Sequence, residues 1–234
     1  MIKRSGAVVA CMAILGACLT AAATSAVAAE DAYRVAGKRL EAGSTKAIRA
    51  SGSTEFTILT KGALGSEIVV TCKKLRFDQA LAPLIVGGLP GRSENEKFEF
   101  QECSATVAGA KCSAAAVETP KVDNELVVVA APSSQAGKLA FLFAPASGTL
   151  FMTLELTGCG LLGSQEVPLE GTSAALVGTP KTEAVKLTLV WKAAEQITEV
   201  EARNGVKQKV GLPHTTIEGE VEVELLSKEK WGVF

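Results

Sequence analysis

The chain has 234 residues, a formal net charge of −1 and 47 % hydrophobic residues. The near-neutral charge and the absence of a basic patch argue against nucleic acid as a partner, and the hydrophobic content is that of a globular protein. No second apolar run of bilayer-spanning length follows the N-terminal segment, so we expect no transmembrane segment once that segment is removed.

The first 28 residues predict a secretory signal peptide. Lys3 and Arg4 form a basic start, residues 5–19 are apolar, and Ala26–Ala28 fits a small-residue cleavage site. In an alternative interpretation, Leu15–Cys18 is a bacterial lipobox and a lipid on Cys18 anchors the protein to the cell surface. Both interpretations export the chain and leave residues 29–234, which we expect to form a single domain.

The rest of the chain reads as short strands separated by turn residues. Strands are predicted at 54–60, 66–72, 97–103, 125–132, 166–172, 183–192 and 216–226, and the Asn204–Gly205 turn joins 197–203 to 206–210 as a hairpin. No segment shows sustained helical spacing. This pattern is typical of an all-β fold, and we expect an antiparallel β-sandwich, with a filled β-barrel as the alternative.

Residues 137–159 predict a central β-hairpin. Its first arm is apolar on both faces from Leu139 to Ala144, so we expect it to be covered on both sides. Pro145 and Gly148 provide turn chemistry. In the return arm, Leu150 to Thr157, apolar and polar residues alternate as in a half-buried strand.

Cysteine content indicates crosslinking. Cys72, Cys103, Cys112 and Cys159 follow the signal peptide, and an even number in an exported chain predicts two disulfides. Because a hairpin-like segment separates Cys103 from Cys112, we predict the pairs Cys103–Cys112 and Cys72–Cys159. A zinc site would need clustered cysteines or histidines, and the chain has one histidine.

Several short motifs follow one another in a particular order along the chain. They are Phe56–Leu59, Ile68–Cys72, Phe98–Cys103, Phe143–Gly148, the pair Gly158–Cys159, and the terminal Lys230–Phe234. In this order they resemble a group of uncharacterised secreted β-rich proteins of high-GC soil bacteria. The resemblance covers most of the exported chain and implies no catalytic residues.

Candidate site residues are few. His214, the one histidine, follows a turn proline and no Gly-x-Ser-x-Gly motif is present, so we expect an exposed loop histidine. The alternating glutamates from Glu218 to Glu224 are typical of the solvent face of an edge strand, with Lys207 and Lys209 as cross-strand partners. The aspartates lack Asp-x-Asp spacing, and we predict no metal, no cofactor and no catalytic residue.

These features favour an exported non-enzymatic β-sandwich protein, a surface or extracellular module that binds an unknown ligand or a cell-envelope partner. The alternative is a secreted hydrolase acting on polysaccharide. Its acid and base would be Glu155 or the glutamates at 94–102, because glycoside hydrolysis needs two carboxyl groups at a fixed separation.

Overall fold

The structure is a computed structural model that describes residues 31–62, 65–193 and 197–234. The signal peptide predicted for residues 1–28 and the lipobox at Cys18 lie outside the described residues. The described chain is built from antiparallel strands, with the short 3-10 helices η2 (Gln79–Leu81) and η3 (Gly160–Leu162). The predicted all-β, disulfide-crosslinked class is confirmed.

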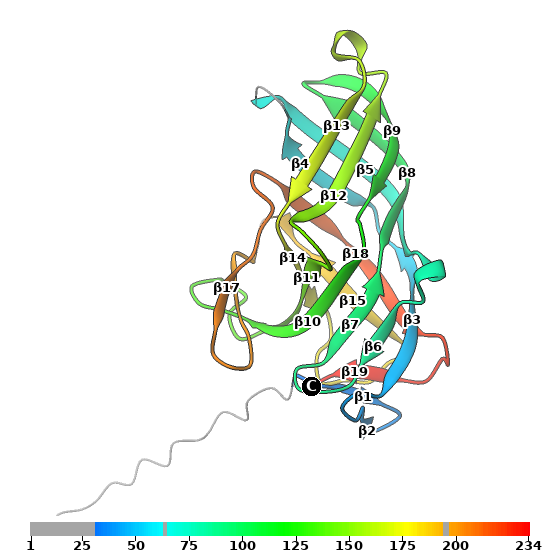
Figure 1. The fold of residues 1–234 in the computed structure, drawn as a ribbon, viewed down its shortest axis with the longest axis vertical. Coiled ribbons are helices and arrows are strands. Elements are labelled where there is room, and N and C mark those ends of the chain that lie inside the picture. The colour runs from blue at the N-terminus through cyan, green and yellow to red at the C-terminus, as the bar shows by residue number, and fades with distance from the viewer. Residues whose placement is uncertain (1–30, 63–64, 194–196) are drawn as a thin grey trace, which may run out of the picture.

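Eight strands close into a barrel, the lower body in Figure 1. In order around the ring they are β18 (Thr216–Leu225), β15 (Lys186–Trp191), β14 (Ser173–Val177), β11 (Leu139–Pro145), β10 (Val122–Val129), β7 (Arg92–Glu96), β6 (Leu84–Val86) and β3 (Thr45–Ser53). The ring closes because β3 pairs back onto β18, from Ile48 opposite Leu225 to Ser53 opposite Val221. This ring corresponds to the barrel alternative of the sequence analysis.

A second group of strands continues upward from the barrel, and we call it the distal sheet (Figure 1). It consists, in order from β18, of β4 (Phe56–Lys61), β5 (Glu67–Phe77), β8 (Phe98–Val107), β9 (Ala110–Glu118), β12 (Leu150–Thr157) and β13 (Gln165–Glu170). Several of these strands lead almost directly into barrel strands. Only Lys97 separates β7 from β8, and only Gly171 and Thr172 separate β13 from β14.

Strand β18 belongs to both parts of the fold. Its first residues, Thr216 to Glu218, pair with β4, and Gly219 to Glu224 pair with β15. Gly219 lies at the change of partner with a φ of +152°, and a Cβ built there would lie 2.5 Å from the Phe56 ring. Glycine therefore allows the strand to cross the Phe56 ring at this junction.

One hydrophobic core runs through the barrel and the distal sheet. Aromatic rings line up along it, with centroid separations from 5.1 to 6.3 Å: Trp231, Tyr33, Phe141, Phe143, Trp191, Phe98, Phe77, Phe56 and Phe100. Such rings bury large apolar areas and pack edge-to-face or offset. The interior is therefore filled by the protein's own side chains.

Strand β11 is covered on both faces, as its sequence predicts. Phe141 and Phe143 lie in the main core, and Ala140 and Leu142 lie in a second apolar cluster on the outside of the barrel. The segment that includes β16 (Glu199–Glu201) and β17 (Lys207–Lys209) supplies Val200 and other residues to this outer cluster. The two strands pair around Asn204–Gly205, which confirms the second predicted hairpin.

The predicted central hairpin of residues 137–159 is wrong in its pairing. Both arms are strands, but β11 pairs with β10 and β14, whereas β12 pairs with β9 and β13. A hairpin would place both arms in one sheet. Here β11, with two apolar faces, lies between the core and the hairpin of β16 and β17. Strand β12 enters the distal sheet instead, where Glu155 and Thr157 are exposed.

A small sheet lies at the lower end of the barrel. Its strands are β19 (Trp231–Val233), β1 (Tyr33–Val35) and β2 (Lys38–Arg39). Ala32 and Phe234 exchange backbone hydrogen bonds of 3.2 and 3.1 Å. The start of the described chain and the C-terminus therefore lie together, at the end opposite the distal sheet (Figure 1).

Candidate functional site

The four cysteines form two disulfides, but both predicted pairs are wrong. Cys72 is bonded to Cys103, and Cys112 to Cys159. Cys72 and Cys103 are direct cross-strand partners on β5 and β8. In the β8–β9 hairpin, Cys112 lies opposite Ala105, so it is displaced by two residues from Cys103. It is left to pair with Cys159, which follows β12, the other neighbour of β9.

The glutamates proposed as an acid–base pair lie apart from one another. Glu155 is exposed on the outer face of β12, opposite Glu166. Glu99 pairs with Arg76 at 2.6 Å, and Glu102 pairs with Lys74. The ion pair with Lys74 also lowers the pKa of the Glu102 carboxyl. Glu155, Glu99 and Glu102 do not converge on a shared cleft.

Glu96 is different, because it lies inside the barrel. Its side chain is 2 % exposed. Ser93 donates a hydrogen bond to it at 2.6 Å, and the Asn124 amide donates another at 3.1 Å. Burial raises the pKa of the Glu96 carboxyl to about 7. The sequence did not distinguish Glu96, since Arg92 to Glu96 contains no apolar residue and resembles a polar loop.

The other charged residues that the sequence singled out, His214 and the alternating glutamates, lie in an exposed turn and along β18. His214 is exposed in a turn with a φ of +54°, as expected. The alternating glutamates do not lie on an edge strand, because β18 is paired on both sides. Lys207 and Lys209 form no ion pair with these glutamates among the described residues, and Lys207 pairs with Glu199 instead. Glu224 is 3 % exposed and pairs with Arg49 and Lys228, each at 2.6 Å.

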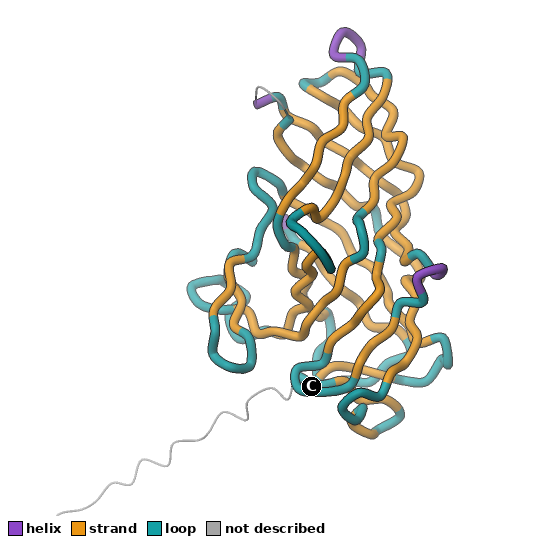
Figure 2. The backbone as a smooth tube through the Cα atoms, viewed as in Figure 1, coloured by secondary structure: helices purple, strands orange, loops and turns teal. Residues whose placement is uncertain are grey.

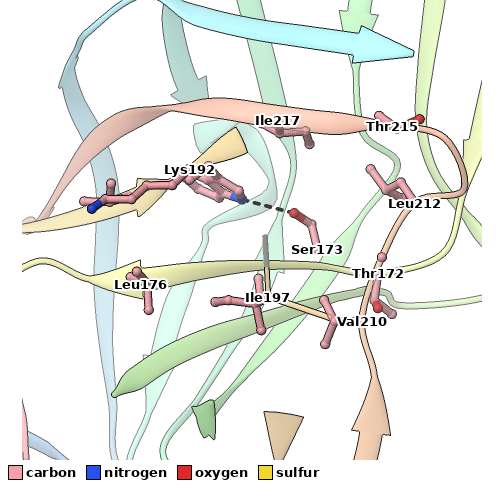
Figure 3. Close-up of a pocket in the computed structure, with 13 residues that line it drawn as sticks. Thr172, Ser173, Leu176, Lys192, Ile197, Val210, Leu212, Thr215 and Ile217 are labelled. Carbon is pink, nitrogen blue, oxygen red and sulfur yellow. Dashed lines mark hydrogen bonds between the residues drawn. The ribbon is translucent and has the colours of Figure 1, made fainter. Parts of the chain in front are cut away.

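A small cavity lies beside Trp191, where β14 meets the segment before β18 (Figure 3). The indole nitrogen of Trp191 donates a 3.1 Å hydrogen bond to Ser173. Ile197 and Val210 close its apolar side. The volume is about 40 Å³, which is space for very few water molecules and not for an organic ligand.

The far end of the distal sheet carries Leu161, the most exposed large apolar side chain of the described chain. We call this end the tip and define it as residues 158–163, between β12 and β13, and residues 108–110, at the turn from β8 to β9. Leu161 is fully exposed and Leu162 is 49 % exposed. Figure 2 shows η3, which contains both leucines, at the apex of the molecule.

The tip is held by covalent and hydrogen bonds. The Cys112–Cys159 disulfide ties its base to β9, and Cys159 is fully buried. The Leu162 amide donates to the Cys159 carbonyl at 3.1 Å, and the Cys159 amide donates to the Gly163 carbonyl at 3.2 Å. The leucines are therefore presented by a closed turn on a crosslinked sheet.

Scans against protein-family models, curated proteins and solved structures return no match. Among the described residues, no group of histidine, cysteine and acidic side chains could hold a metal ion. The described part of the chain also has no helix that is long and apolar enough to cross a membrane.

Proposed function

We propose that the protein is an exported, non-enzymatic module that binds at the cell surface or outside the cell. The observation that carries this proposal is the arrangement of the distal sheet, in which a filled, doubly crosslinked body presents fully exposed Leu161 at its apex. Disulfides of this kind persist in oxidising compartments, which supports export.

Two cavities inside the described part of the chain are too small for a substrate, whereas larger hollows of about 490 and 440 Å³ lie at the outer surface. The cavity beside Trp191 has a volume of about 40 Å³, and one between Phe56 and Met152 has a volume of about 10 Å³. Ligand pockets for small organic molecules have volumes of several hundred Å³. This supports binding through the outer surface.

The test is to incubate the purified chain, starting at Ala29, with isolated cell envelopes and with a panel of polysaccharides. We expect saturable binding to envelopes and no release of sugar. Release of sugar that is lost in Glu155→Gln but kept in Glu166→Gln would contradict the proposal in favour of the hydrolase. Glu166 is the matched control because it lies directly opposite Glu155 on the neighbouring strand.

A further inference from the structure

Leu161 differs from every other exposed large apolar residue of the described chain. Leu59, Leu81, Leu89, Val185, Val206 and Leu226 are between 36 % and 53 % exposed, and so each keeps about half of its surface covered. Leu161 keeps none covered, and Leu162 follows it directly. Single half-exposed apolar residues are ordinary, whereas a fully exposed leucine followed by a half-exposed one requires a reason.

Charge at the tip is sparse. Residues 157–165 contain no acidic or basic side chain, and residues 104–115 contain only Lys111. Lys111 is exposed and lies opposite Thr106 in the hairpin beside the tip. The first acidic residue along the chain after the leucines is Glu166, on β13. The tip itself therefore presents leucines and small residues. Lys111 lies beside it on β9, and Glu67 of β5 lies next to Ala108, whose amide donates to the Glu67 carbonyl at 2.8 Å.

The shape and composition of the tip favour a lipid bilayer over a protein as its partner. A projecting turn offers little area to a flat protein surface, and leucine is under-represented among the residues that dominate protein interfaces. A lipid bilayer deforms around a projecting turn, and leucine transfers favourably into its apolar region. Anionic headgroups would attract Lys111.

We propose that the tip inserts Leu161 and Leu162 into an anionic lipid bilayer, with Lys111 at the headgroups. This rests on the proposed function and names the partner. The Cys112–Cys159 bridge keeps the turn in shape, so little conformational freedom is lost on insertion. Two leucines make a small anchor, and binding is therefore weak and reversible.

The experiment uses the mature chain from Ala29, without any lipid anchor, and vesicles of phosphatidylcholine with or without phosphatidylglycerol. Cosedimentation is expected with the anionic vesicles and is expected to fall with added salt. The variant with both Leu161→Ser and Leu162→Ser should bind about tenfold more weakly or worse. Leu226→Ser is the matched control, because Leu226 is also 49 % exposed but lies beyond the barrel end of β18.

A second variant reports insertion directly. Leu161→Trp should show a blue-shifted emission when anionic vesicles are added, and Leu226→Trp should not. The native Trp191 and Trp231 are 5 % and 1 % exposed, so their emission should not change. Because Leu161 makes no buried contact, we expect both variants to fold, which their thermal unfolding would verify.

Three results would overturn the inference. They are no binding to either vesicle, equal binding by the double-serine variant, and self-association in the absence of lipid that the double-serine variant loses. The last would assign the tip to a second copy of the chain. If envelopes still bind the chain in any of these cases, the inference fails and the proposed function stands. If neither vesicles nor envelopes bind, both fail.

Discussion

At the scale of single residues, Glu96 is the least expected feature. A carboxyl group inside an apolar barrel is costly when charged, because it loses its hydration. Ser93 and Asn124 offset part of this cost with hydrogen bonds, and Asp123 opposes ionisation through its negative charge. The balance leaves the Glu96 pKa at about 7, above its ordinary value of 4.5.

This shift predicts that stability depends on pH. Because the pKa of Glu96 is higher in the folded than in the unfolded chain, its contribution is complete below about pH 4.5 and is lost as the pH rises through about 7. The free energy of unfolding should fall by about 3 kcal/mol across this range. Denaturant titrations at several pH values would measure it.

The variant Glu96→Gln should remove most of the pH dependence of stability. At alkaline pH it should unfold at a higher denaturant concentration than the parent protein. Glu99→Gln serves as the control, since Glu99 is a surface residue paired with Arg76, and it should leave the slope unchanged. An unchanged slope in Glu96→Gln would show that another group titrates.

At the scale of elements, the sequence predicts strands much better than it predicts their partners. The all-β pattern, the two apolar faces of β11 and the turn at Asn204–Gly205 are local signals, and all three are confirmed. The pairing of β12 with β9 depends on residues far apart in the chain. Nothing near Pro145 specifies that the two arms separate into different sheets.

The same reason explains the wrong disulfide pairs, the unpredicted burial of Glu96 and the missed leucines of the tip. A hairpin brings Cys103 near Cys112, but only the register of β5 on β8 places Cys72 directly opposite Cys103. Glu96 is buried through barrel closure, which no local pattern reveals. Leu161 and Leu162 stand between glycines in the sequence, and this was the one available signal for the tip.

The junction at Gly219 makes a prediction for β18. A side chain there would strain the backbone and meet the Phe56 ring, so Gly219→Ala should lower the free energy of unfolding by about 2 to 4 kcal/mol. Gly205→Ala is the control, because its φ is +78° and no atom lies within 4 Å of the added Cβ. It should cost about 1 kcal/mol. Equal losses in thermal or denaturant unfolding would contradict a clash at Phe56.

At the scale of the whole molecule, the crosslinked distal sheet extends from one end of a filled barrel, and the two ends of the described chain lie at the other end. Both disulfides lie in the distal sheet, where they join β5 to β8 and β9 to the segment after β12. Phe234 and the start of the described chain lie at the opposite end (Figure 1). A tether at the N-terminus would therefore leave the tip free to meet another surface.

The central claim is that the chain is exported and becomes crosslinked as the structure has it. It is tested most directly by mass spectrometry of the secreted or surface protein, intact and after digestion with trypsin without reductant. Trypsin can cut at Lys73, Lys111 and Lys121, among other sites, and so places the four cysteines on separate peptides. We predict a chain that begins near Ala29, or at a lipidated Cys18, with linked peptides for Cys72–Cys103 and Cys112–Cys159. Free thiols, a retained signal peptide or a Cys103–Cys112 link would contradict the account.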